Sequence, residues 1–264
     1  MKHLRISLVC LLLVVVTPLR SVDKEAKGKK TPFDPSEIPA SVVRGDLERA
    51  LDYNKVCVAV YREGVKKIDA NGSEDSTDAF FLAYHLLGQA QLNAMIGDLP
   101  GAAKNLREAD NISHHPSYAA MFGNSPLADG WQDIFAATKG FVLEKSGRSA
   151  EAKQAYLSRP SYYSLPRLGI LAVNAHNESE ATKYVQQTFQ DSGKRAHNAT
   201  HNPTAHIVLA MLHERIGKVQ DALLEYENAL KYMEKGEIGN NQFLPIVVAE
   251  AASAKSGRLR LSSK

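Results

Sequence analysis

Histidine is the residue type in this chain whose spacing comes nearest to a metal site. His197, His201 and His206 are four and five residues apart, close to the spacing that places two ligands on one helix face. The asparagines and the proline between them predict a solvated loop in place of a helix, and the chain contains no HExxH motif. We therefore expect neither a metal site nor a bound cofactor.

Arrangements for nucleophilic or acid–base catalysis are also missing from the sequence. The segment around Ser125, GNSPLADG, lacks the second glycine of a nucleophile elbow, and neither a P-loop nor a GxGxxG loop occurs. Cys57 lies in the apolar stretch VCVAVY, which predicts a buried side chain. The paired acids Glu225 and Glu227 fall in a segment patterned for helix packing. We expect a protein that is not an enzyme.

The elements that would carry any site are helices. From about Val42 to Gly257, apolar residues recur three and four positions apart, and no stretch alternates as a β-strand would. Glycine or asparagine interrupts the pattern at short intervals, which predicts short helices joined by tight turns. The expected fold class is all-α.

Alignment at the interrupting glycines reveals a repeat. A small residue precedes each glycine by seven positions, an alanine follows at the fifth position and a large residue at the ninth. The copies contain Ala90, Gly97, Ala102 and Leu106; Gly140, Gly147, Ala152 and Tyr156; and Leu209, Ala210, Gly217, Ala222, Tyr226 and Ala229. Because glycine tolerates positive φ and small residues let backbones approach, each copy predicts a helix–turn–helix hairpin that must stack on its neighbours.

Two weaker copies extend the array. In SLPRLGILAVNAHNESEATKYVQQTF, Gly169 takes the small position, His176 replaces the turn glycine and Ala181 follows at the fifth position. Near the start of the pattern, Gly45 and Ala50 repeat the glycine–alanine spacing. The repeat therefore covers most of the helical region.

The pattern small–x6–Gly–x4–Ala–x3–aromatic–x2–Ala resembles the tetratricopeptide repeat (TPR). The copy from Pro203 to Glu234 matches best, although His206 stands where the family often has tryptophan and the closing proline is missing. The resemblance implies an α-solenoid of stacked TPR-like hairpins over residues 41–257, which binds a protein or peptide partner in its concave groove. The steps between copies are irregular, so we expect insertions at about 111–130 and 192–203.

The resemblance also implies which side chains face that groove. They come from the first helix of three hairpins and are Tyr84, Leu87 and Gln91; Phe141, Glu144 and Lys145; and Ile207, Met211, Glu214 and Arg215. Packing against an adjacent repeat is the alternative for Leu87, Ile207 and Met211. Some family members hold a terminal carboxylate with lysines and asparagines, but Gln91 and Met211 occupy the asparagine positions here, so we do not expect that mode of binding.

The N-terminal residues predict an export signal. Lys2 and Arg5 precede the apolar run Ile6–Val16, and polar residues follow it, which is the layout of a secretory signal over residues 1–22. The run is shorter than the about 20 residues that span a bilayer. Since no clear cleavage site follows the run, a membrane anchor facing the periplasm is the alternative.

Charge is distributed so that the body of the chain is neutral. The sequence has 32 basic and 29 acidic residues, and Lys2, Arg5 and Arg20 account for the surplus. Such a body lacks the excess of positive charge that nucleic-acid binding requires. Residues 23–40, rich in lysine and proline, predict an extended linker, and residues 258–264 form a basic tail.

We therefore expect a secreted or periplasmic scaffold that binds a protein or peptide and no nucleic acid. It would meet a membrane only through an uncleaved N-terminal segment. One alternative is a membrane-anchored adaptor of a transport or secretion assembly, and another is a hydrolase or metal-binding protein that uses the inserted loops. Sequons at Asn71, Asn111, Asn177 and Asn198 lie in expected surface turns. They are interpreted either as glycosylation sites or as triplets that occur by chance.

Overall fold

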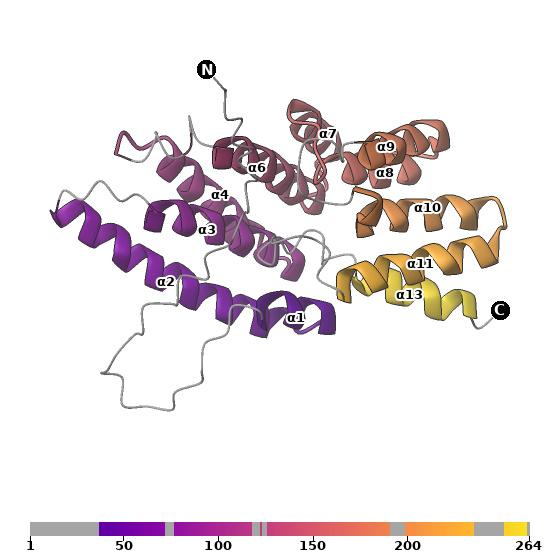
Figure 1. Cartoon of the computed structure of the whole chain (residues 1–264), viewed down its shortest axis with the longest axis horizontal. Coiled ribbons are helices and arrows are strands. Elements are labelled where there is room, and N and C mark those ends of the chain that lie inside the picture. The colour runs from indigo at the N-terminus through magenta and orange to yellow at the C-terminus, as the bar shows by residue number, and fades with distance from the viewer. Residues whose placement is uncertain are drawn as a thin grey trace, which may run out of the picture. The chain divides into compact units, whose positions relative to one another are not determined.

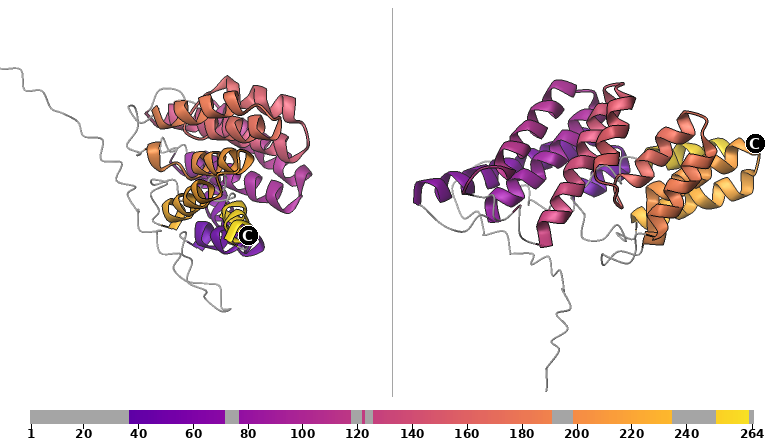
Figure 2. Two further views of the ribbon diagram at one scale, coloured as in Figure 1. Left: turned by 90° about the vertical axis from the view of Figure 1, so that its right-hand side faces the viewer. Right: turned by 90° about the horizontal axis from the view of Figure 1, so that it is seen from above.

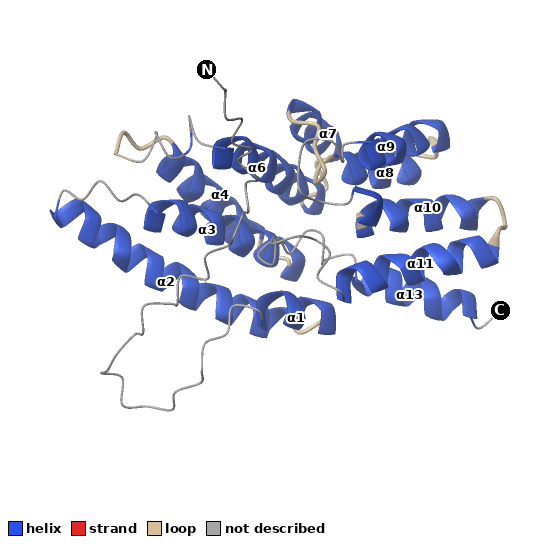
Figure 3. Cartoon of the chain, viewed as in Figure 1, coloured by secondary structure: helices blue, strands red, loops and turns tan. Residues whose placement is uncertain are grey.

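The computed structural model describes residues 37–71, 77–117, 122, 126–190, 199–234 and 251–262, which belong to one compact unit. Within these residues all regular structure is helical and no strand occurs (Figure 3). The expected all-α class is therefore confirmed for the described part of the chain. The expected signal, most of the expected linker and His197 lie outside the described residues.

The helices follow one another closely along the chain (Figure 1). Their bounds are α1 Glu37–Arg44, α2 Leu47–Asn71, α3 Thr77–Ile96, α4 Leu99–Ser113, α6 Pro126–Lys145, α7 Ser149–Ser158, α8 Leu165–Asn174, α9 Glu178–Gln190, α10 Pro203–Arg215, α11 Val219–Glu234 and α13 Ala251–Ser262, with a short 3₁₀ turn, η2, at Ala199–His201.

Consecutive helices pair into hairpins, and the hairpins contact one another in sequence. The pairs are α1 with α2, α3 with α4, α6 with α7, α8 with α9 and α10 with α11. Between pairs, α2 packs on α3, α3 on α6, α7 on α8, and α8 and α9 on α10, while α13 covers α11 (Figure 2). Helix α13 also contacts α1.

The turns within the hairpins have the conformation that the repeat predicts. Gly45, Gly97, Gly147 and Gly217 all adopt positive φ, between 74° and 88°. His176, the residue aligned with these glycines, adopts φ 59° and is the only described non-glycine residue with positive φ. The aligned residue therefore has a left-handed conformation in all five hairpins, including the one that lacks the glycine.

The small and large positions of the repeat also contact each other as expected. A Cβ added to Gly140 would lie 2.4 Å from the ring of Tyr156, so only glycine permits this approach of α6 and α7. The repeat positions Ala90, Ala102, Ala152, Ala210, Ala222, Ala229, Gly140, Tyr156 and Tyr226 are buried. Leu106 and Leu209 are half-buried. Burial of these positions contributes to cohesion within and between hairpins.

Three expected boundaries are corrected. Helix α1 begins at Glu37, inside the expected linker 23–40, and accommodates Pro39 because the N–H groups of the first turn have no partner within the helix. Helix α13 extends to Ser262, so most of the expected basic tail 258–264 is helical. Both ends of the expected insertion 111–130 belong to helices, since α4 continues to Ser113 and α6 begins at Pro126.

Among the described residues, no helix combines the length and apolar character needed to cross a bilayer. The apolar run Ile6–Val16 is not among them.

Candidate functional site

A groove of about 720 Å³ opens between helices of three successive hairpins and α13. We call it the interhelix groove. Six of the side chains expected to face a partner line it, and they are Glu144, Lys145, Ile207, Met211, Glu214 and Arg215. Helix α8 contributes Arg167, Ile170, Val173 and Asn174, and α11 and α13 contribute Tyr226, Ser256, Gly257 and Arg260. The groove is therefore lined by both apolar and charged side chains.

One end of the groove is built around Glu144. Its carboxylate accepts a hydrogen bond of 2.9 Å from the hydroxyl of Tyr156 and a bidentate pair from Arg167, with Nε at 3.3 Å. The side chain of Arg167 is only 2% exposed, and its guanidinium lies 5.2 Å from the centre of the Phe141 ring. Burial opposes the charge of Arg167, but Glu144 outweighs it and raises the pKa of the guanidinium.

The other end repeats this arrangement around Glu214. The hydroxyl of Tyr226 donates to its carboxylate at 2.6 Å, and Arg260 of α13 donates at 2.6 and 2.9 Å. A Cβ on Gly257 would lie 2.4 Å from the Tyr226 ring, so α13 and α11 approach as closely as α6 and α7 do. In both places a glutamate joins a tyrosine of its own hairpin to an arginine of the next described helix along the chain.

Lys145 has a different environment from the paired arginines. Its ammonium lies 5.3 Å from the centre of the Phe141 ring, and no described carboxylate forms an ion pair with it. Partial burial, together with the positive charge of Arg167, lowers the pKa of Lys145. Arg215 at the same groove pairs with Glu178 at 2.9 Å and hydrogen-bonds His176.

Four of the expected partner-facing residues do not line the interhelix groove. Tyr84, Leu87, Gln91 and Phe141 are buried. Helix α3 is enclosed by α2, α4 and α6, so its expected partner-facing side is occupied by protein. Gln91 shows this directly, because its amide donates a 2.7 Å hydrogen bond to the buried hydroxyl of Thr138 on α6. Ile207 lines the groove but is also nearly buried.

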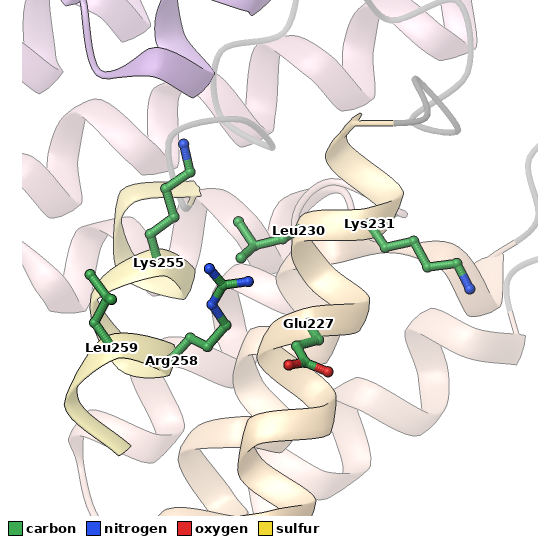
Figure 4. A pocket seen from close by; sticks show the side chains of 6 residues that line it. All are labelled: Glu227, Leu230, Lys231, Lys255, Arg258 and Leu259. Atoms are coloured by element: carbon green, nitrogen blue, oxygen red, sulfur yellow. The ribbon is translucent and has the colours of Figure 1, made fainter. Parts of the chain in front are cut away.

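A smaller cleft of about 280 Å³ lies between α11 and α13. It is lined by Glu227, Leu230, Lys231, Lys255, Arg258 and Leu259 (Figure 4). Leu230 points toward α13, whereas the ammonium of Lys231 points away from it. None of these residues was expected to face a partner, and the cleft joins only two helices, so the interhelix groove is the stronger candidate site.

The expectation for His206 was wrong, because this histidine is buried in α10 and not solvated in a loop. One ring nitrogen contacts a carboxylate oxygen of Glu225 at 2.5 Å and the other contacts the carbonyl oxygen of Thr200 at 2.8 Å. These contacts tie the 3₁₀ turn η2 to the last hairpin. His201 stacks on Tyr232 with ring centres 4.2 Å apart. Across the described residues, no group of three or more histidine, cysteine, aspartate and glutamate side chains is arranged to hold a metal ion.

Cys57 is buried in α2, as its apolar surroundings predict, and burial raises the pKa of its thiol to about 12. The thiol is therefore protonated at neutral pH and is a poor nucleophile. Of the sequons, Asn111 lies inside α4 and not in a turn. Asn177 uses its side chain at the start of α9, where it accepts from the Glu180 N–H and donates to the Glu180 carboxylate.

Comparisons of the chain with family models, with curated proteins and with solved structures find no match.

Proposed function

We propose that this protein is a non-enzymatic scaffold, an α-solenoid of TPR-like hairpins that holds a peptide segment of a partner protein in the interhelix groove. The observation that carries the proposal is the convergence of Glu144, Lys145, Met211, Glu214 and Arg215 on one groove. These residues come from separate copies of the repeat. A lining of apolar and charged side chains suits a peptide, which presents both apolar side chains and a polar backbone.

The N-terminal sequence supports a location for this activity. We propose that the run Ile6–Val16 directs the chain out of the cytoplasm, so that the scaffold acts in the periplasm or outside the cell. Retention of the run would instead make the protein a membrane-anchored adaptor. The N-terminal sequence of the protein isolated from its source distinguishes the two, since cleavage after the run excludes the anchor.

Selection from a phage-displayed library of random peptides, with the full chain as bait, tests the binding activity. Asn174 is exposed and lines the groove, so Asn174→Trp should obstruct the groove without disturbing the core. Gln154→Trp places the same side chain at an exposed position of α7 that does not line the groove.

We expect peptides enriched by the wild type to bind the Gln154→Trp variant equally and the Asn174→Trp variant at least about tenfold more weakly. Affinities are measured by fluorescence anisotropy with synthetic copies of the enriched peptides. The proposal would be contradicted if no peptide were enriched, or if the enriched peptides bound the Asn174→Trp variant as tightly as the wild type.

A further inference from the structure

The acidic side chains of the interhelix groove are already neutralised by the protein. Glu144 accepts from Tyr156 and Arg167, and Glu214 accepts from Tyr226 and Arg260. Each carboxylate thus has a full-charge partner and a hydroxyl donor, which is the arrangement that satisfies a partly buried carboxylate. Neither glutamate is free to attract a basic ligand.

Two further cations line the same groove, and neither forms an ion pair with a carboxylate of the groove, although Glu144 lies close enough to attract Lys145 electrostatically. Lys145 contacts the ring of Phe141 and has no ion-pair partner among the described residues. Arg215 pairs with Glu178, which does not line the groove and is half exposed. The groove therefore carries an excess of positive charge, although the body of the chain is neutral.

The lining of the groove also includes apolar side chains, of which Ile170, Val173 and Ile207 are buried and Met211 is half-buried. The first two belong to α8 and the other two to α10. Side chains of an extended peptide point alternately to opposite sides. An extended segment can therefore turn one set of side chains toward these apolar residues while the alternate set carries the carboxylates that complement Lys145 and Arg215.

We infer that the occupant of the groove is an extended segment of a partner protein in which acidic side chains alternate with apolar ones, with Lys145 binding a carboxylate. The inference rests on the proposed function and specifies the chemistry of the partner. A basic segment would meet Lys145 and Arg215 with like charge, and like charges placed together at an interface disfavour binding.

Charge reversal at Lys145 tests the inference on the full chain. The peptide selection is run in parallel with the wild type, Lys145→Glu, Lys145→Gln and a matched control, Lys139→Glu. Lys139 is an exposed residue of the same helix that does not line the groove. The control therefore makes the same change in net charge. Circular dichroism and thermal unfolding establish that each variant is folded.

We expect the wild type and Lys139→Glu to enrich peptides with aspartate and glutamate between apolar residues. Lys145→Glu should lose them and enrich lysine and arginine instead. A synthetic acidic peptide, N-acetylated and C-terminally amidated, should bind Lys145→Glu at least about tenfold more weakly than the wild type, with Lys145→Gln between the two. Its asparagine and glutamine counterpart should discriminate little among these variants.

Failure of the inference and failure of the proposed function give different results. If the enriched peptides show no preference for acidic residues but bind the Asn174→Trp variant weakly, the inference of an acidic partner segment is overturned and the proposed binding groove stands. Acidic peptides that bind Lys145→Glu as well as Lys139→Glu would also overturn the inference. Absence of any enriched peptide would overturn both.

Discussion

Glu144 and Glu214 occupy equivalent positions in their hairpins, each twelve residues before the tyrosine whose hydroxyl it accepts. Their arginine partners differ in exposure, because the side chain of Arg167 is 2% exposed and that of Arg260 is 54% exposed. A buried cation that loses its carboxylate cannot be rehydrated without disrupting the core, whereas an exposed one can. The glutamate–arginine pair therefore contributes more to the free energy of unfolding at Glu144 than at Glu214.

Substitution of each glutamate by glutamine measures this difference. We expect Glu144→Gln to lower the free energy of unfolding by about 3 kcal/mol or more, and Glu214→Gln by about 1 kcal/mol. Urea denaturation of the two variants beside the wild type makes the comparison. Equal losses would mean that the burial of Arg167 does not govern the energetics of the pair.

His85 on α3 predicts a pH dependence of stability. Burial lowers its pKa from 6.5 to about 4, so the folded protein holds the ring neutral while the unfolded chain protonates it below about pH 6.5. The unfolded state therefore binds more protons between these values, and stability falls as the pH decreases from 6.5 to 4, by about 3 kcal/mol in total.

Thermal unfolding of the wild type and of His85→Gln, followed from pH 7 to pH 4, separates this contribution from that of other groups. The variant should lose less stability over the interval, whatever its stability at pH 7. Parallel pH profiles for the two proteins would show that His85 is not responsible.

Part of the site could be predicted from the sequence, because the resemblance to the TPR implies which residues of the first helix of each hairpin face a groove. Glu144, Lys145 and Met211 were predicted from that resemblance, and all three line the interhelix groove. Nothing in the pattern predicts Arg167 or Arg260, which lie on other helices at separations of 23 and 46 residues from their glutamates. Such pairs depend on how hairpins stack, and a local repeat does not specify that.

At the scale of the element, the turn between α8 and α9 is the one that departs from the repeat. His176 adopts a left-handed conformation that costs a non-glycine residue about 1–2 kcal/mol, while the aligned turns use glycine. We expect His176→Gly to raise the free energy of unfolding by about 0.5–1 kcal/mol, because the relief of strain exceeds the added entropy of the unfolded chain.

The reciprocal change, Gly147→His, should lower the free energy of unfolding by a similar amount. Urea denaturation of both variants measures the two changes. The contact from Arg215 to His176 is exposed, so its loss should cost little. A destabilised His176→Gly variant would indicate that this contact outweighs the strain.

At the scale of the whole described unit, α13 covers the last hairpin and contacts the first helix. It packs Gly257 on Tyr226, supplies Arg260 to Glu214 and touches α1. In a protein of stacked units, loss of a terminal element destabilises its neighbours most and distant units least. Removal of residues 251–264 should therefore increase amide hydrogen exchange in α10, α11 and α1, while α3 and α4 remain protected. Uniform loss of protection would indicate one indivisible cooperative unit.

Because of the contacts of Glu144 and Glu214, α8 and α13 are equivalent at the point where each meets the hairpin before it. Arg167 approaches Glu144 and Tyr156 as Arg260 approaches Glu214 and Tyr226. The helices are therefore candidates for exchange by protein engineering. A chain in which α13 follows α7 directly would present an arginine to Glu144 and close the array of helices after fewer hairpins, so that the choice of the closing helix would set the length of the protein.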